Sequence, residues 1–457
     1  MTTLTFYGGA RSVTGSNYLI ETEKTKIVID CGLIQGGKHA EDQNTLPFAY
    51  DPKQVTVVLI THAHIDHTGR LPKLFKDGFR GEVISTNPTK DLIKIMLEDS
   101  QDLLEAEARR ENSIPLYSKE DVQDVVEHCR GVDYNEEFLI NNDIRVRFRD
   151  AGHILGSAII EVWVKNEKGE EKKIAFSGDL GNPSAVLIRP TENIEGVDYA
   201  IIESAYGNRR HEEAGERKNM LEDTIEDTIT KGGVLMIPSF AVERTQELLY
   251  ELNLLIENHR IPSVPIFIDS PMAIDALKIY AKYPQYYNQE AMHLIAKGDK
   301  LFDFPRLQFT YTSDESKKIN EVLAPKIIIA GSGMSTGGRI LHHEIRYLSD
   351  PNSTLLIIGY QVAGSLGRRL LDGADEVKIL GQDVTVRARI KAIGGYSAHA
   401  DQDGLYSWIN EMNKMGHLNK VFVVQGEEAA ALALSQLLRD NLGVDAVAPT
   451  AGESFVI

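Results

Sequence analysis

Cysteine is nearly absent from this chain, which has two cysteines in 457 residues. Cys31 and Cys129 lie far apart in the sequence and form no metal-binding motif with each other. A disulfide framework is therefore excluded, and a reducing compartment is expected. The chain also lacks an apolar run long enough to span a bilayer, and its start has no signal-peptide pattern. We therefore expect a cytoplasmic protein without a membrane partner.

Positive charge is in deficit as well. The chain has 49 Lys and Arg residues against 67 Asp and Glu residues, which gives a formal net charge of −18. Such a surface disfavours nonspecific coating of nucleic acid, although it is compatible with a local basic groove. Repeats of fixed period and low-complexity linkers are missing too. The hydrophobic fraction of 42% is that of a soluble globular protein, and the length predicts two domains.

What the chain does have is a cluster of histidines. His62, His64 and His67 stand with Asp66 in a single short segment that directly follows the apolar run 55–60. The run is typical of a buried strand, and imidazole nitrogens beside a carboxylate are ligands for a divalent metal. On extended backbone His62 and His64 point to the same side, so they can bind one ion together. Asp66 and His67, past the turn, are expected to hold a second ion.

The arrangement and its surroundings resemble the metallo-β-lactamase fold. In this comparison His153, after the strand-like segment 144–148, and Asp179, after the segment 173–176, are expected as further metal ligands. Both follow a strand end and are followed by glycine, as a ligand on a loop requires. A carboxylate such as Asp179 can bridge two cations about 3.5–4 Å apart. Asp30 also ends a strand, and it is expected to orient the histidine loop without binding metal itself.

Strand and helix patterns alternate in the first half of the chain. Residues 3–31 predict three short strands with Gly-rich turns. Residues 88–110 predict a long helix that opens with Pro88 in its first turn, and residues 118–130 predict a second helix capped by Ser118. These patterns favour a mixed α/β domain.

From about residue 209 the pattern becomes one of βαβ units, which is typical of a parallel α/β module. Its predicted elements are helices 213–231 and 242–258 and strands 234–237, 264–268, 326–329 and 354–358. A further strand at 386–390 precedes a return to chemistry-bearing motifs. We therefore predict one domain made of residues 1–208 and 386–457, interrupted by an inserted domain at 209–385.

An α/β insert between Asp179 and a C-terminal return resembles the β-CASP branch of the metallo-β-lactamase superfamily, whose members cut nucleic acids. Glu203, at the end of the apolar run 199–202, matches the acidic motif of this branch, and His399 matches its second motif. Loops similar to those of the branch occupy residues 238–248, 331–339 and 359–369. The resemblance covers nearly the whole chain. It implies an αββα sandwich with an inserted parallel α/β domain, in a relative of the pre-mRNA 3′-end cleavage endonuclease.

The chain departs from the branch at Glu243, where a small residue is expected, and at a second position that matters for the metal site. The third motif of the branch is a histidine that ends a strand, but here the strand-like segment 421–424 is followed by Gln425. An amide oxygen is a poorer zinc ligand than an imidazole nitrogen. The resemblance therefore implies two zinc sites, of which the second is left with Asp66, His67 and Asp179 and is expected to be weakened.

The resemblance also implies a reaction, the hydrolysis of RNA phosphodiesters by a metal-bound hydroxide, since a metal ion lowers the pKa of its bound water toward ~7. Asp66 is expected to orient this nucleophile or to take its proton. His399 is the candidate donor of a proton to the leaving oxygen. Glu203 is expected to hold the tautomer of His399 or to raise its pKa.

The insert is expected to supply phosphate contacts. Gly-rich backbone can offer N–H donors to an anion, and arginines can pair with phosphates bidentately. The candidates are Arg244, Ser332, Gly333, Arg339, Arg368 and Arg369. Single-stranded RNA, as opposed to DNA, follows from the resemblance alone, because no residue pattern reads a 2′-hydroxyl. A homodimer is left open.

Three functions stay open on the sequence: a metal-dependent endoribonuclease, a hydrolase of other phosphodiesters such as DNA or cyclic nucleotides, and an RNA-binding protein whose catalysis is impaired by Gln425. A thioester or lactam hydrolase is disfavoured, because it would not need Glu203, His399 and a large insert. Zinc-dependent shortening of labelled single-stranded RNA separates a cleaving protein from a binding one.

Overall fold

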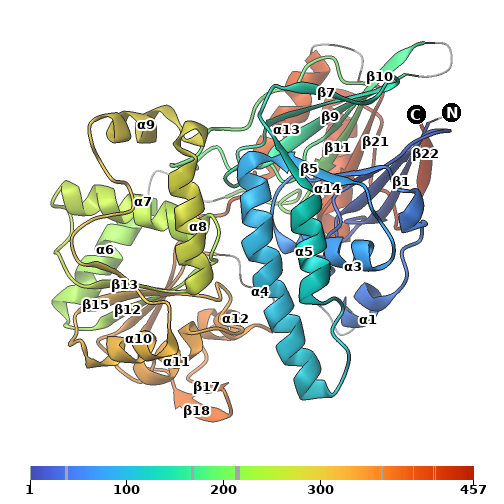
Figure 1. Cartoon of the computed structure of the whole chain (residues 1–457). Helices are drawn as coiled ribbons and strands as arrows, with labels where there is room; N and C mark the ends of the chain where they lie inside the picture. The colour runs from blue at the N-terminus through green and yellow to red at the C-terminus, as the bar shows by residue number, and fades with distance from the viewer. Residues whose placement is uncertain are drawn as a thin grey trace. The chain divides into compact units, whose positions relative to one another are not determined.

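The computed structural model describes residues 2–36, 40–165, 169–211, 217–359, 361, 364–394, 396–414, 416 and 418–457. The chain divides into two compact units, which we describe separately (Figure 1). Unit 1 consists of Met1–Pro183, Pro190–Arg210 and His399–Ile457, and unit 2 consists of Ser184–Arg189 and His211–Ala398. None of the described helices has an apolar stretch long enough to cross a membrane.

Two seven-stranded sheets form the centre of unit 1. Across the first sheet the strands are β22 (Ser454–Val456), β1 (Thr3–Gly8), β2 (Asn17–Glu21), β3 (Lys26–Ile29), β4 (Val57–Leu59), β5 (Glu82–Thr86) and β6 (Cys129–Val132). Across the second they are β21 (Ala446–Val447), β20 (Lys420–Val424), β11 (Tyr199–Glu203), β10 (Glu171–Phe176), β9 (Ala158–Lys165), β8 (Ile144–Asp150) and β7 (Glu137–Asn141). Leu59 of the first sheet and Phe176 of the second belong to one buried cluster, so the two sheets share a core.

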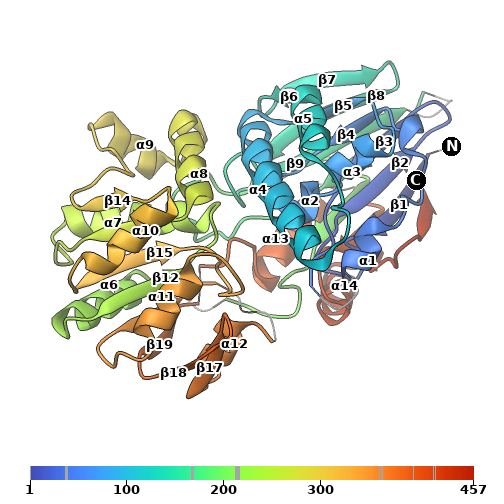
Figure 2. The ribbon, with the colours of Figure 1, turned by 60° about the horizontal axis from the view of Figure 1, so that its bottom comes forward.

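Helices cover the outer faces of both sheets of unit 1 (Figures 1 and 2). The first sheet is accompanied by α1 (Ala40–Thr45), α2 (Ile65–Thr68), α3 (Leu71–Lys76), α4 (Asn87–Glu111) and α5 (Lys119–His128), and the second by α13 (Gln402–Lys414) and α14 (Glu428–Leu442). The two predicted helices of the first half are confirmed. Thr86 caps α4 by accepting from the Thr89 amide, and Ser118 forms a capping box with Asp121 at α5. The αββα sandwich expected from the sequence is present.

Unit 2 is built on a six-stranded parallel sheet. In order across the sheet its strands are β14 (Leu307–Phe309), β13 (Ile266–Asp269), β15 (Lys326–Ala330), β12 (Val234–Pro238), β16 (Thr354–Ile357) and β19 (Arg389–Ala392). The helices are α6 (Arg217–Thr230), α7 (Arg244–Glu257), α8 (Pro271–Lys282), α9 (Gln289–Ala296), α10 (Ser313–Lys318), α11 (Ile340–Tyr347) and α12 (Leu366–Leu371), and β17 (Glu376–Ile379) and β18 (Gln382–Thr385) form a separate hairpin.

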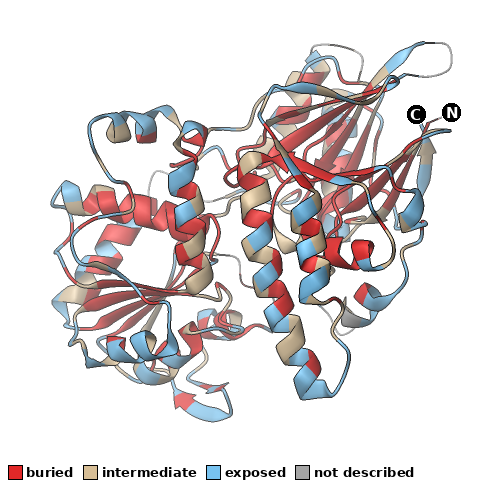
Figure 3. Cartoon of the chain, viewed as in Figure 1, coloured by how far each residue is buried: buried red, intermediate tan, exposed pale blue. Residues whose placement is uncertain are grey.

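Both faces of the sheet of unit 2 are buried, as Figure 3 shows by colour. Because side chains alternate along a strand, Leu235 of β12 joins the cluster formed with α6, α7 and α8. Its neighbour Met236 joins the opposite cluster, which contains residues of α11 and α12. The near-continuous apolar runs read from the sequence are therefore those of a parallel sheet covered on both sides.

The predicted end of the insert at residue 385 differs from the division seen in the structure. β19 pairs in parallel with β16, with Arg389 opposite Thr354, and so completes the sheet of unit 2. Unit 1 resumes only at His399, and the short segment Ser184–Arg189 also belongs to unit 2. The start of the predicted helix 213–231 falls on residues 212–216, which lie outside the described residues. An apolar pattern predicts that a strand forms, but not which sheet it joins.

Asp269 is a fully buried carboxylate at the end of β13 that connects several elements of unit 2. It accepts hydrogen bonds from Thr310 Oγ1 and Ser316 Oγ, both at 2.6 Å, and from Arg339 Nη1 at 2.7 Å, and it lies 2.7 Å from His343 Nε2. Burial alone would raise the pKa of this carboxyl. The four partners outweigh burial and hold the pKa well below its usual range.

Replacing Asp269 by asparagine should lower the free energy of unfolding by about 3 kcal/mol, because the partners of the buried carboxylate lose its charge. Urea denaturation measures this loss, and Asp303→Asn, which removes an exposed carboxylate paired with Lys300 at the surface, serves as the matched control with an expected change below about 0.5 kcal/mol. Since the pKa of Asp269 is lower in the folded state, its contribution is present above about pH 4 and is lost as the pH falls. An unchanged unfolding midpoint in Asp269→Asn would contradict this role.

Candidate active site

The histidine segment follows the end of β4, where the chain bends at Thr61. His62 and His64 lie in the loop between β4 and α2, and His67 lies in the one-turn helix α2. His62 and His67 are fully buried, and His64 is partly exposed. Gly32 allows this packing, because a Cβ on it would lie 1.6 Å from the backbone oxygen of Asp66.

His153 and Asp179 come from two loops at ends of strands of the second sheet. The backbone amides of His153 and Ile154 both donate to Ser157 Oγ, which closes the loop that follows β8. Asp179 follows β10 and Gly178, whose φ is +55° and which packs against Thr61. The positive φ and the close approach both favour glycine at this position.

Four side chains from these segments converge on one point. His64 Nδ1 lies 3.1 Å from His62 Nε2 and 3.3 Å from His153 Nε2. Asp179 Oδ2 lies 3.5 Å from His62 Nε2 and 3.6 Å from His153 Nε2. Among the described residues this set forms one of two groups of ligand atoms close enough to hold a metal ion, and the other consists of Asp179, Glu203 and His399.

The spacing of the four atoms fits zinc. Zn–N bonds of about 2.0–2.1 Å in a tetrahedral site place the ligand atoms about 3.3–3.4 Å from one another. The observed separations of 3.1–3.6 Å bracket that value. Burial and the neighbouring His67 hold the pKa of His62 well below its usual range, so this imidazole is neutral and its lone pair is available for a metal.

A second set of atoms lies around Gln425. His67 Nε2 is 3.6 Å from Asp66 Oδ2 and 3.4 Å from Asp179 Oδ1. Gln425 Nε2 is 3.1 Å from Asp66 Oδ2 and also 3.1 Å from His67 Nε2. The amide of Gln425, at the position where the resemblance predicts a histidine, therefore lies beside Asp66 and His67. Its nitrogen, which cannot bind a metal, faces Asp66 and His67, while Gln425 Oε1 is buried without a hydrogen bond.

Asp30, which the sequence predicts to orient the histidine loop, lies in contact with one of these histidines. Its Oδ2 lies 2.7 Å from His67 Nδ1, and its two oxygens also accept from Ser16 Oγ, Thr61 Oγ1 and the Thr61 amide. Burial would lower the pKa of His67, but the carboxylates of Asp179, Asp30 and Asp66 outweigh it and raise the pKa well above its usual value. The position thus favours positive charge. Neither Ser16 nor Thr61 was singled out from the sequence. The position of Thr61 beside His62 could have suggested Thr61, but no sequence signal pointed to Ser16.

Glu203 and His399, both candidate residues from the sequence, contact each other in unit 1. Glu203 ends β11, is fully buried, and accepts a hydrogen bond from the Leu180 amide at 2.6 Å. His399 Nδ1 lies 3.1 Å from Glu203 Oε2 and 3.9 Å from Asp179 Oδ2. Its backbone is joined to the Asp179 loop by a bridge to Gly181.

The electrostatics of this pair favour a protonated histidine. Burial would lower the pKa of His399, but Glu203 and Asp179 outweigh it and raise the pKa to about 9. Burial raises the pKa of Glu203, and the proximity of His399 opposes that effect. With Nδ1 directed at Glu203, the Nε2–H of His399 is left as the group that can give up a proton.

Three of the six phosphate-binding candidates in unit 2 need correction. Arg244 is buried and paired with Glu243 and Glu247, and a Cβ on Gly333 would lie 2.6 Å from the ring of Phe240, so Gly333 is covered. Arg339 donates to Asp269 and to the backbone oxygens of Thr310 and Tyr311. Gly-rich loops and arginines indicate phosphate binding only where their donors face solvent, and a sequence does not show which donors do.

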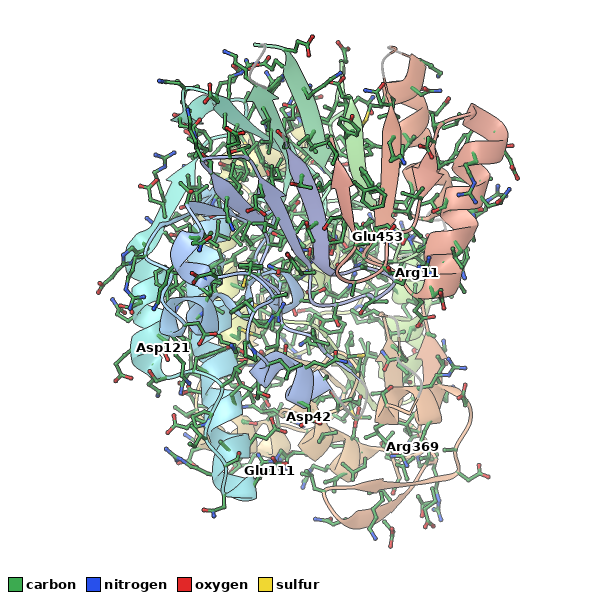
Figure 4. All side chains as sticks on the ribbon, turned by 90° about the vertical axis from the view of Figure 1, so that its right-hand side faces the viewer. Arg11, Asp42, Glu111, Asp121, Arg369 and Glu453 are labelled. Atoms are coloured by element: carbon green, nitrogen blue, oxygen red, sulfur yellow. The ribbon has the colours of Figure 1, made fainter. Side chains whose placement is uncertain are left out.

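The other three candidates remain partly or fully exposed. Arg369 lies on the surface of α12 (Figure 4). Arg368, on the same helix, donates to Asp372, and Ser332 Oγ accepts from the amides of Thr336 and Gly337 within its own loop. These three stay predictions.

Comparison with known families assigns matches to three parts of the chain. Residues 11–132 match the metallo-beta-lactamase superfamily, residues 245–370 match the Beta-Casp domain, and residues 383–449 match the Zn-dependent metallo-hydrolase RNA specificity domain. Together these matches span both units described above.

Several proteins are similar over nearly the full chain. Ribonuclease TTHA0252 of Thermus thermophilus is 38% identical, over 94% of this chain and 95% of that protein. The RNase J-like protein of Methanocaldococcus jannaschii is 31% identical over 99% of both chains. Transcription termination factor FttA of Methanosarcina mazei is 32% identical, over 98% of this chain and 70% of that protein. A crystal structure of a protein of unknown function from Enterococcus faecalis has the same fold, with a TM-score of 0.57, 14% identity and full coverage of both chains.

Proposed function

Because this chain belongs to the β-CASP branch of the metallo-β-lactamase superfamily, we propose that it is a zinc-dependent endoribonuclease that hydrolyses phosphodiesters of single-stranded RNA. The observation that carries the proposal is the convergence of His62, His64, His153 and Asp179 within zinc-ligand spacing. These four residues hold the first zinc. Asp66, His67 and Asp179 contribute to the second.

When bound, zinc supplies a water nucleophile at neutral pH and neutralises charge on the phosphate. Asp66, in hydrogen-bond contact with Gln425, is placed to orient the nucleophile or to take its proton. Asp30 keeps the Nδ1 proton of His67 on the far side of the ring, so that His67 Nε2 faces the ligand cluster. Ser332, Arg368 and Arg369 contribute phosphate contacts from unit 2.

His399 donates the proton that the leaving oxygen requires. The Nδ1 atom of its ring is held by Glu203, whose charge stabilises the imidazolium form. Glu203 itself is buried and receives the Leu180 amide, so it can hold the ring without being drawn into the reaction. The pair therefore divides the work into positioning by Glu203 and proton transfer by His399.

The proposal is tested by incubating an internally labelled circular RNA with the purified protein. Added Zn²⁺ should linearise the circle, and a chelator should prevent it, because only an endonucleolytic cut opens a circle. A linear single-stranded DNA and a cyclic nucleotide serve as competing substrates. If the circular RNA stays intact while the DNA or the cyclic nucleotide is hydrolysed, the protein is a hydrolase of other phosphodiesters. Binding of RNA without any cleavage would favour a protein whose catalysis is impaired by Gln425.

Gln425→His should raise zinc content and the rate of RNA cleavage together. As long as the Gln425 amide nitrogen faces Asp66 and His67, the second site should bind zinc at least about tenfold more weakly than a site with its full ligand set. Metal analysis after dialysis should therefore show nearer one zinc than two per wild-type chain, and nearer two in the variant. Gln436→His, on the exposed part of α14, serves as a control for adding an imidazole.

Two outcomes would overturn this account of Gln425. Two tightly held zinc ions in the wild-type protein would mean that the amide coordinates through Oε1, which a rotation of the amide by half a turn would place at the site. A variant that gains zinc without gaining rate would mean that Gln425 does not limit the chemistry.

A further inference from the structure

The ligand atoms around Gln425 differ in chemistry from those of the first zinc site. The first site offers three imidazole nitrogens and one carboxylate oxygen. Around Gln425, His67 contributes an imidazole nitrogen, and Asp66 and Asp179 contribute carboxylate oxygens. Gln425 itself can add only an oxygen, because an amide nitrogen donates hydrogen bonds and does not bind a metal. Oxygen therefore predominates at the second site and nitrogen at the first.

Two oxygen atoms of the second site are buried without a hydrogen bond. Asp179 and Gln425 are each 2% exposed, and neither Asp179 Oδ1 nor Gln425 Oε1 has a hydrogen-bond partner. Buried polar atoms in native proteins are nearly always satisfied, and an ion is one of the groups that can satisfy them. Both side chains lie beside His67, whose Nε2 is 3.4 Å from Asp179 Oδ1 and 3.1 Å from the Gln425 amide nitrogen. The unsatisfied oxygens therefore indicate a cation at this place.

A half-turn of the Gln425 amide brings its oxygen to the other ligand atoms. Nε2 lies 3.1 Å from both Asp66 Oδ2 and His67 Nε2, and the half-turn exchanges Nε2 with Oε1. Because the two ends of an amide are nearly equal in size, the exchange changes the chemistry of this position and not its shape. Gly9 leaves room on the opposite side, where a Cβ would lie 2.5 Å from Gln425 Oε1. After the exchange, Gln425 Oε1 completes a set of ligand atoms with Asp66, His67 and Asp179.

The type of ligand atom decides which ion each site prefers. Imidazole nitrogens suit zinc, whereas carboxylate, carbonyl and water oxygens suit Mg²⁺, Ca²⁺ and Mn²⁺. The three imidazoles of the first site therefore keep zinc. At the second site the oxygens favour a hard cation. The nitrogen of His67 then favours Mn²⁺ over Mg²⁺ and Ca²⁺, because those two ions bind almost entirely through oxygen.

We propose that the second site of this chain selects Mn²⁺, with Gln425 Oε1 as a ligand beside Asp66, His67 and Asp179. The centre then holds zinc and manganese together. The inference rests on the proposed function as a metal-dependent ribonuclease and names the second metal of that site. The replacement of histidine by glutamine at position 425 therefore changes the metal preference of the site and does not abolish metal binding.

The test uses the full-length protein after dialysis, with zinc retained at the first site. MnCl₂ is titrated into this protein, and room-temperature EPR measures the free Mn²⁺, whose signal is lost on binding. The wild type should bind about one Mn²⁺ per chain without releasing zinc, because the imidazoles of the first site prefer zinc. An equal concentration of Mg²⁺ should not displace the bound Mn²⁺. Zinc content is measured on the same samples.

Two substitutions at position 425 test the amide oxygen itself. Gln425→Asn keeps the amide but shortens the side chain, so the oxygen no longer reaches the other ligands, and the affinity for Mn²⁺ should fall at least about tenfold. Asparagine also tolerates the left-handed backbone at this position, where φ is 48°. Gln425→His supplies a nitrogen ligand, so the preference for Mn²⁺ relative to zinc should fall at least about tenfold. Gln436→Asn, at an exposed position of α14, is the matched control and should change neither value.

The failure of this inference can be told apart from the failure of the proposed function, because Mn²⁺ binding is measured without RNA. A protein that binds Mn²⁺ as expected but cleaves no RNA would overturn the proposed function alone. A wild type that binds no Mn²⁺, binds it only in exchange for zinc, or loses it to Mg²⁺ would overturn the inference. An Asn variant that binds Mn²⁺ as the wild type does would also overturn it, because Gln425 would then not be a ligand. If thermal unfolding shows that the Asn variant does not fold, the comparison between the wild type and Gln425→His carries the test.

Discussion

Replacing His399 by alanine should lower the single-turnover rate of RNA cleavage by roughly 10²–10⁴-fold, the range expected for the loss of a general acid. The zinc content should stay unchanged, because His399 Nδ1 is directed at Glu203 and its contact with the Asp179 carboxylate is longer, at 3.9 Å. Metal analysis and kinetics on the same preparation test both statements. If the low rate of the wild type limits the measurement, the Gln425→His background provides a more active reference.

The pH dependence of this reaction should report on the same histidine. Because Glu203 and Asp179 outweigh burial and raise the pKa of His399 to about 9, the ring is protonated at neutral pH and loses its proton on the alkaline side. The rate should therefore fall as the pH rises through that pKa, and His399→Ala should remove the decline. Glu203→Gln should lower the rate less than His399→Ala, since it keeps a hydrogen-bond partner and loses only the charge. Loss of zinc in His399→Ala would place this imidazole on the metal and overturn its role as proton donor.

His64→Ala should abolish zinc binding at the first site and RNA cleavage together. His64 Nδ1 lies within 3.3 Å of both His62 Nε2 and His153 Nε2, so replacing His64 removes the ligand atom that lies between the other two imidazoles. The zinc affinity should fall more than about 100-fold, because removing a ligand exceeds the 10–100-fold cost of removing a group that only orients one. Competition with a chromogenic chelator measures the affinity without relying on activity.

Two controls make the His64 result specific. His293→Ala, on the surface of α9, removes an imidazole from unit 2 and should change neither zinc content nor rate. Circular dichroism of His64→Ala should match the wild type, because His64 is partly exposed and makes no contribution to the buried core of the sheets. A variant that keeps its zinc but loses activity would remove His64 from the first ligand set.

The sequence by itself determined the fold class and the ligand candidates of this protein. Both depend on local patterns, since the apolar run before His62 predicts a strand end and the alternation of strands and helices after residue 209 predicts a parallel sheet. A residue that follows a strand lies at the end of the sheet where the strands terminate, whichever neighbours that strand pairs with. For this reason His62, Asp179 and Glu203 could be named before their contacts were known.

Only the tertiary structure decided which residues far apart in the sequence contact one another. Arg244 and Arg339 have the residue type of phosphate ligands, but their contacts with Glu247 and Asp269 engage them in ion pairs. β19 was predicted as a strand, and its pairing with β16 assigned it to unit 2. The direction of the Gln425 amide, with Nε2 toward Asp66, follows from packing against residues more than 350 positions away. Such choices depend on which surfaces meet in the folded chain and on the hydrogen bonds that burial then requires, and a local pattern specifies neither.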